Sequence, residues 1–216
     1  LVPFSPEAPL SGVNRSLQPW QTLWYRRTLD VSPRVGFRLL LHFGAIDQMA
    51  AVYVNDVLTA EHTGGYTAFS VDITQYLKDT DNVLTVAVLD GTDTNELSRG
   101  KQRTKRGGIW YTPQSGIWQT VWLEAVPKSY VRNLRITPDF DGAAVDISAE
   151  IVGDEDAYAH FGGESYLLPA RIPVPDFEPW SPEHPKLYGF SVTCGEDEVQ
   201  SYFAMRKFSV EKDKDG

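Results

Sequence analysis

Two clusters of carboxylates are the first groups in this sequence that could perform acid–base chemistry. They are Asp154-Glu155-Asp156 and Glu196-Asp197-Glu198. A catalytic carboxylic acid needs apolar surroundings that raise its pKa, whereas both triplets lie in polar, turn-like stretches. We therefore expect neither triplet to be catalytic, and the sequence predicts no catalytic residue in this chain.

A second concentration of reactive groups lies in a long segment between two predicted strands, from Asp90 to Tyr111. Trp110 and Tyr111 follow five cations that fall within eight residues: Arg99, Lys101, Arg103, Lys105 and Arg106. Charge-assisted hydrogen bonds from such cations can hold an anion. Loops of this length without regular structure are usually functional or mobile. The segment is therefore either an anion-binding loop or a solvated, disordered one.

Metal and nucleotide chemistry find little support. The four histidines lack the spacing of zinc ligands, and the Gly107-Gly108 pair lacks the strand-to-helix context of a phosphate-binding loop. Cys194 is the single cysteine, so no intrachain disulfide can form. The sequence predicts no metal site and no cofactor.

Composition limits the partners of this 216-residue chain. The first 127 residues are nearly neutral, so most of the net charge of −9 lies after them, which indicates a domain boundary. The acidic balance argues against nucleic acid as a partner. No apolar run approaches the roughly 20 residues that cross a bilayer, and the compartment, cytoplasmic or exported, is left open.

Short alternating runs of apolar and polar residues dominate the chain and predict strands. One short helix is expected over residues 72–77 with Asp72 as its N-cap, and Asn55-Asp56 is expected to form a tight turn. Five tryptophans are expected to be core residues: Trp20, Trp24, Trp118, Trp122 and Trp180. The predicted strands cover residues 23–29, 37–43, 51–54, 57–58, 67–71, 82–88, 117–125, 131–137, 144–152, 166–172, 187–193 and 199–210.

Motifs in the same order along the chain resemble glycoside hydrolase family 2, which includes β-galactosidases, β-glucuronidases and β-mannosidases. The clearest is the segment 115–124, SGIWQTVWLE, which looks like the closing strand of the family's sugar-binding domain. The others in that domain are PLSGV at 9–13, WYRR at 24–27, HFGAID at 42–47, VYVN at 52–55, GGYTAF at 64–69 and VDIT at 71–74. PWSPEHPKLY at 179–188 and SYFAMRK at 201–207 resemble the family's immunoglobulin-like domain.

The resemblance implies where the chemistry of the parent enzyme would lie. Family members hydrolyse glycosides with two carboxylates on a (β/α)8 barrel, a domain that needs around 250 residues and that this chain does not contain. The arginine that matches Arg206 supports the nucleophilic carboxylate of that barrel. The loop that matches residues 90–111 walls the sugar subsite. Lactose-cleaving members place an acidic, metal-coordinating residue where this chain has Trp110, so that metal contact is not carried over.

Together these observations predict an all-β protein, with a jelly-roll-like, galactose-binding-type sandwich at residues 1–127 and a small immunoglobulin-like sandwich at 128–216. The expected function is the non-catalytic N-terminal part of a family 2 glycosidase that braces the missing barrel and binds carbohydrate weakly by itself. The candidate site residues are Arg206 and a possible sugar loop with Asp90, Arg99, Lys101, Arg103, Trp110 and Tyr111. The loop's cations favour an anionic sugar. An autonomous carbohydrate-binding module is the alternative function.

Overall fold

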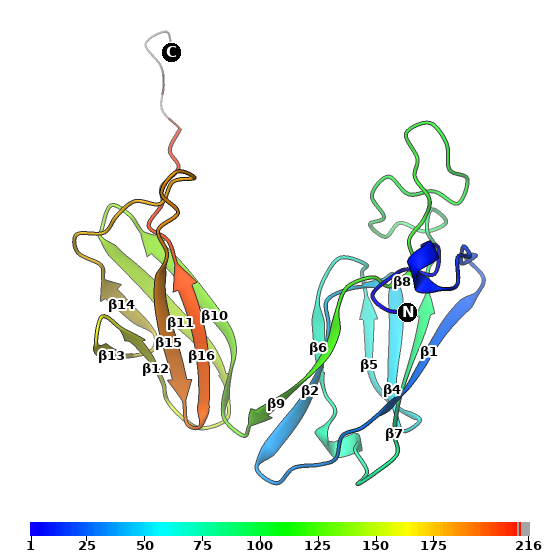
Figure 1. The fold of residues 1–216 in the computed structure, drawn as a ribbon, viewed down its shortest axis with the longest axis horizontal. Coiled ribbons are helices and arrows are strands. Elements are labelled where there is room, and N and C mark those ends of the chain that lie inside the picture. The colour runs from blue at the N-terminus through cyan, green and yellow to red at the C-terminus, as the bar shows by residue number, and fades with distance from the viewer. Residues whose placement is uncertain (211, 213–216) are drawn as a thin grey trace. The chain divides into compact units, whose positions relative to one another are not determined.

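The computed structural model describes residues 1–210 and 212, and almost all of its regular structure is β-strand (Figure 1). The chain divides into two compact units, Leu1–Ala125 and Val126–Gly216. The predicted fold class is confirmed: a jelly-roll-like sandwich is followed by a small immunoglobulin-like sandwich. The functional boundary at residue 127 stays a prediction.

The first unit is a sandwich of two antiparallel sheets, with strand orders β1-β7-β4-β5 and β6-β2-β9, and a two-stranded ribbon of β3 and β8. The bounds of its strands are β1 (Thr22–Leu29), β2 (Phe37–Phe43), β3 (Ile46–Asp47), β4 (Met49–Val54), β5 (Val57–Thr63), β6 (Phe69–Asp72), β7 (Asn82–Leu89), β8 (Gly116–Ile117) and β9 (Val121–Pro127).

Alternation along the strands builds the core of the first unit. In β7 every second residue is buried, from Asn82 to Val88, because successive side chains of a strand point to opposite faces. Phe43 of β2 and Val52 of β4 are fully buried in the same cluster. The predicted turn at Asn55-Asp56 is present, and both residues adopt the positive φ of a tight hairpin turn, 51° and 66°.

The helix predicted over residues 72–77 is wrong. The structure has only a 3-10 turn, η2 (Thr74–Tyr76), and Asp72 is instead the last residue of β6. The Asp72 carboxylate accepts a hydrogen bond from the backbone N–H of Thr74 at 3.0 Å. Asp72 therefore closes a local Asx-type turn, which competes with helix formation.

The second unit packs a sheet of order β10-β11-β14 with one of order β13-β12-β15-β16. Its core includes Val145, Ile172, Val192 and Met205, all fully buried. The bounds of its strands are β10 (Tyr130–Asp139), β11 (Ala144–Val152), β12 (Ala157–Phe161), β13 (Glu164–Leu167), β14 (Ala170–Pro173), β15 (Tyr188–Cys194) and β16 (Asp197–Phe203).

The tryptophan predictions are mostly wrong. Trp20, Trp24 and Trp122 are 78%, 61% and 45% exposed, and Trp118 is only half-buried. Trp24 points outward because the inward positions of β1 belong to its neighbours in the alternation, as Leu23 and Tyr25 pack on the core. Trp180 is outside the core cluster of the second unit.

Candidate functional site

A long loop, residues 90–115, connects β7 to β8 and projects from the end of the first unit where the N-terminal segment also lies (Figure 1). Two tight contacts begin it: the Asp90 carboxylate accepts the backbone N–H of Thr92 at 2.6 Å, and the Thr94 hydroxyl donates to Gly91 O at 2.7 Å. We call this segment the 90–115 loop.

Backbone hydrogen bonds fold the 90–115 loop back on itself. Tyr111 N–H donates to Lys101 O at 2.8 Å, and Arg103 N–H donates to Tyr111 O at 3.2 Å. The Asp93 carboxylate accepts both the N–H and the hydroxyl of Thr104, at 3.1 and 2.8 Å, and these bonds hold the pKa of Asp93 below its usual value. Lys101, Arg103 and Tyr111 are thereby fixed side by side.

The predicted sugar-loop residues fall into two groups. Arg103, Trp110, Tyr111 and Lys101 lie together: the Arg103 guanidinium stacks 3.8 Å from the centroid of the Trp110 ring, and Tyr111 is 68% exposed. Such cation–π stacking holds a guanidinium in a defined position. Asp90 is not part of this surface, because it is only 2% exposed and lies at the base of the loop.

Arg99 is half-buried and makes no ion pair or cation–π contact among the residues that the structure describes. The loop thus stacks Arg103 on Trp110, and backbone bonds join Lys101 and Arg103 to Tyr111.

A buried polar cluster under the loop was missed from the sequence. Asp47, Gln48, Asp90, Thr92 and Ser115 are all buried. The Gln48 amide accepts a bond from Asn95 Nδ2 at 2.8 Å and donates to Thr92 O at 3.4 Å, so it fastens the first turn of the loop to the sandwich. The only sequence signal was a polar pair, Asp47-Gln48, inside an otherwise apolar run.

Polar bonds also connect the loop to the N-terminal segment and to the β5–β6 turn. The Tyr66 hydroxyl accepts Gln102 Nε2 at 3.2 Å, and burial raises the pKa of Tyr66, with the Asp47 and Asp90 carboxylates adding to the shift. The Glu7 carboxylate accepts the backbone N–H of Ser115 at 3.0 Å. Three segments far apart in the sequence therefore meet at this end of the unit.

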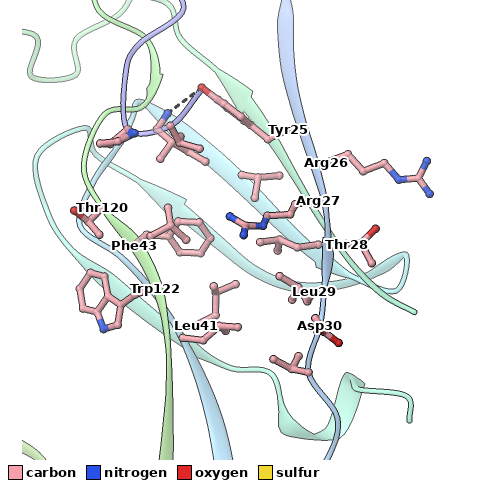
Figure 2. Close-up of a pocket in the computed structure, with 18 residues that line it drawn as sticks. Tyr25, Arg26, Arg27, Thr28, Leu29, Asp30, Leu41, Phe43, Thr120 and Trp122 are labelled. Carbon is pink, nitrogen blue, oxygen red and sulfur yellow. Dashed lines mark hydrogen bonds between the residues drawn. The ribbon is translucent and has the colours of Figure 1, made fainter. Parts of the chain in front are cut away.

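An apolar groove of about 650 Å³ opens between the edge strands β1 and β9. Figure 2 shows core residues such as Leu41 and Phe43 at the groove, with Arg26 and Arg27 pointing to opposite sides of β1. Arg27 occupies an inward position of the strand, yet it is exposed and has no ion-pair partner within residues 1–210 and 212. The groove offers unpaired strand edges rather than a set of reactive groups.

One Ser–His–Glu array lies on the outer face of the β6-β2-β9 sheet. His42 Nδ1 is 2.7 Å from the Ser70 hydroxyl, and His42 Nε2 is 2.8 Å from Glu124 Oε2. The second contact is close but is not a hydrogen bond, because the Glu124 oxygen lies off the direction in which the ring N–H would point. His42 also stacks on Trp122 at 4.8 Å. We regard the array as a cross-strand polar contact that stiffens the sheet.

In the second unit, Arg206 stacks against two aromatic rings. Its guanidinium carbon lies 4.4 Å from the centroid of Trp180 and 4.0 Å from that of Phe208. Arg206 itself is exposed. Trp180, which was expected in the core, therefore stacks on an arginine instead. The role predicted for Arg206 in the parent enzyme stays a prediction.

The described part of the chain contains no group of three or more His, Cys, Asp or Glu side chains suited to hold a metal ion. Within the same residues, no helix has the length and apolar character to cross a membrane. The acidic triplets of the second unit lie at its surface, and Asp197 accepts the backbone N–H of Val131 at 2.8 Å, which is a structural role.

Comparison with known proteins places this geometry in context. The family model described as "Glycosyl hydrolases family 2, sugar binding domain" matches residues 13–127. A β-galactosidase of Thermoanaerobacter pseudethanolicus is 27% identical over 210 residues, with 85% of this chain and 27% of that protein covered. A β-glucuronidase of Canis lupus familiaris is 28% identical over 221 residues, covering 82% of this chain and 33% of that protein.

Two solved structures share the fold. A β-glucuronidase of Faecalibacterium prausnitzii aligns with a TM-score of 0.71 and 24% identity, over 94% of this chain and 40% of that one. A Ruminococcus gnavus β-glucuronidase in complex with D-glucuronic acid aligns with a TM-score of 0.73 and 20% identity, over 88% and 37%. The chain thus spans about a quarter to two fifths of the proteins named here.

Proposed function

Because the chain belongs to glycoside hydrolase family 2, we propose that its first unit binds carbohydrate at the end that carries the 90–115 loop. The observation that carries this proposal is the stacking of Arg103 on Trp110, in a loop that also exposes the Tyr111 ring. Aromatic rings offer an apolar face to the C–H groups of a sugar, and a stacked guanidinium presents donors to its oxygens. In a longer parent enzyme this surface would form one wall of the substrate pocket.

The preferred sugar carries a carboxylate. Lys101 and Arg103 are joined through Tyr111 by backbone bonds, so two cations lie next to the aromatic surface. Charge-assisted hydrogen bonds from them to a carboxylate are roughly twice as strong as neutral ones. The β-glucuronidase that binds D-glucuronic acid shares this fold, which supports the same class of ligand here.

The second unit braces the catalytic barrel of the parent enzyme through Arg206. A guanidinium held between Trp180 and Phe208 is positioned before any partner arrives. It can then bind a carboxylate without losing further side-chain freedom, which favours the ionised form of that carboxylate. The family resemblance supports the nucleophilic carboxylate of the barrel as this partner.

A carbohydrate-binding module that adheres to a polysaccharide is the second candidate function, because Trp24 offers an aromatic platform. Trp24 projects from the outer face of β1, with Tyr53 beside it at 6.4 Å between ring centroids. Ala87 and Ala51 follow Trp24 in register across β7 and β4, so small side chains leave room next to the ring.

Calorimetric titration of the purified chain with glucuronate, galacturonate, glucose and galactose tests both candidates. We expect the uronates to bind with a dissociation constant of about 1 mM, and Arg103→Gln to weaken that binding at least severalfold. Trp24→Ala is the matched variant for the platform and should leave uronate binding unchanged. Equal binding of neutral and acidic sugars, or a loss with Trp24→Ala alone, would favour the polysaccharide-binding function.

A further inference from the structure

Asp47, at the base of the 90–115 loop, is a buried carboxyl group without a donor. It is only 3% exposed, and its Oδ1 has no hydrogen-bond partner in the described structure. The hydroxyl of Ser115 is also buried and without a partner, and Gly116, the next residue, pairs with Asp47 across the β3–β8 ribbon. An ionised carboxylate in such a place is costly, because nothing replaces its lost hydration.

The charged neighbours of Asp47 are of the same sign. Asp90, just after β7, and Glu7 from the N-terminal segment both act on it electrostatically, and among the described residues no Lys, Arg or His does. The other titratable groups at this end are Tyr66 from the β5–β6 turn and Tyr25 from β1. Tyr66 is neutral near pH 7, since burial raises its pKa further above neutrality, and the same holds for the buried Tyr25 hydroxyl.

Asp47 also lies next to Gly65 and Gln48, two residues that bond to segments at the ends of the loop. Its Oδ1 lies so close to Gly65 that a Cβ at residue 65 would collide with it. Gly65 O accepts the indole N–H of Trp118 at 2.8 Å. Gln48, the next residue after Asp47, holds Asn95 and Thr92 of the loop. Asp47 is therefore connected to the start of the 90–115 loop through Gln48 and to the residues just after its end through Gly116 and Gly65.

We propose that Asp47 is a proton-operated switch for the 90–115 loop: the neutral carboxyl keeps the base of the loop closed, and the ionised carboxylate, facing Asp90 and Glu7, loosens it. The switch acts on the loop that the proposed function uses, but it requires no bound sugar. Its test is therefore independent of whether the chain binds uronates.

The switch operates between the ordinary pKa of an aspartate and the raised pKa of Asp47. Burial, followed by the charges of Asp90 and Glu7, raises the pKa of Asp47 to about 7. Because the folded pKa lies above the unfolded value of 3.8, the contribution of Asp47 to stability is complete below that value and is lost as the pH rises through 7. Between pH 6 and pH 8.5 this linkage favours the open loop by about tenfold.

Trypsin reports the opening of the loop directly, since the loop carries five Lys and Arg residues, from Arg99 to Arg106. The experiment compares cleavage rates of the intact chain and of Asp47→Asn at each pH, so that the pH dependence of trypsin cancels in the ratio. We expect the ratio of wild type to Asp47→Asn to rise about tenfold from pH 6 to pH 8.5. Asp30→Asn, an exposed carboxylate in the same unit, should behave as wild type. A flat ratio overturns the proposal.

A second measurement needs only the wild-type chain. In carboxyl-carbon NMR titrations, the Asp47 signal should change near pH 7, together with the indole N–H of Trp118 that is bonded to Gly65. The switch would be refuted if the Asp47 signal titrated near pH 4, or if the chemical shift of the Trp118 indole N–H did not change as Asp47 titrates. Neither result depends on the folding of a variant, and failure to bind uronates alters neither.

Discussion

At the scale of single residues, the buried amide of Asn82, at the start of β7, joins three other segments of the first unit. Asn82 is fully buried, and its Nδ2 donates to Val31 O and Lys78 O, each at 2.8 Å. Its Oδ1 accepts Asn55 Nδ2 and Lys78 N–H at the same distance. All four hydrogen-bonding positions of the amide are therefore used, and three segments depend on one side chain.

Replacing Asn82 with alanine should destabilise the first unit by about 2–3 kcal/mol, because several buried donors and acceptors would lose their partner at once. Urea unfolding followed by tryptophan fluorescence measures the change. Gln119→Ala, which removes an exposed amide of the same unit, should change the free energy of unfolding by less than about 0.5 kcal/mol. Equal effects of the two substitutions would contradict the network.

Residues of this kind are the ones that sequence reasoning misses. The cations of the loop are dense enough to be noticed in the sequence, whereas Asp47, Asn82 and Ser115 are single polar residues with nothing unusual about their spacing. What makes them important is their burial and their partners from distant segments, and a single sequence contains neither. Trp24 shows the reverse: its apolar character predicted a core position, but the alternation of β1 places it on the exposed face.

At the scale of elements, the strands with clear alternation were predicted well and the short ones were not. Residues 144–152 were predicted as a strand and form β11 with the same bounds. β12 (Ala157–Phe161) was missed, because the buried residues Ala157 and Ala159 are too small to give a clear alternation of apolar and polar side chains. The strand predicted over 166–172 is two strands, β13 and β14, because Leu168 and Pro169 interrupt the pairing.

The Asp93 carboxylate adds side-chain bonds to the backbone bonds that fold the 90–115 loop on itself. Asp93 accepts two bonds from Thr104, so Asp93→Ala should free the segment that carries the cations. We expect tryptic cleavage between residues 99 and 106 to accelerate severalfold, without a change in the thermal unfolding of the unit. Asp79→Ala, at an exposed turn, is the control. If cleavage stayed unchanged, Asp93 would not be what holds the loop.

We expect the inward-pointing Arg27 to protect the open side of the sandwich between β1 and β9. Charged residues at such positions keep the unpaired edges of β1 and β9 from pairing with another molecule. Arg27→Leu should therefore cause self-association at concentrations where the wild type is monomeric, as measured by sedimentation velocity. Arg26→Leu adds the same apolar side chain on the opposite side of β1 (Figure 2) and should remain monomeric. Association of both variants, or of neither, would count against this protective role.

At the scale of the whole molecule, the described residues of the two sandwiches supply surfaces, and no two of their carboxyl groups both have a raised pKa. The one carboxyl group of the described residues with a pKa raised toward 7 is Asp47, and it is buried at the base of the 90–115 loop. We expect the purified chain to release no 4-nitrophenol above the blank rate from 4-nitrophenyl β-D-glucuronide or the corresponding galactoside. Turnover that persists through stringent purification and follows the chain's concentration would disprove this expectation.

The most direct test of the account is an NMR titration that locates the bound sugar on the nitrogen-15-labelled chain. With glucuronate, the account predicts shifts of the backbone amides around Lys101, Arg103 and Tyr111 and of the Trp110 indole, and much weaker shifts with glucose. Shifts centred on Trp24, or equal shifts with both sugars, would contradict an acidic-sugar site on the 90–115 loop.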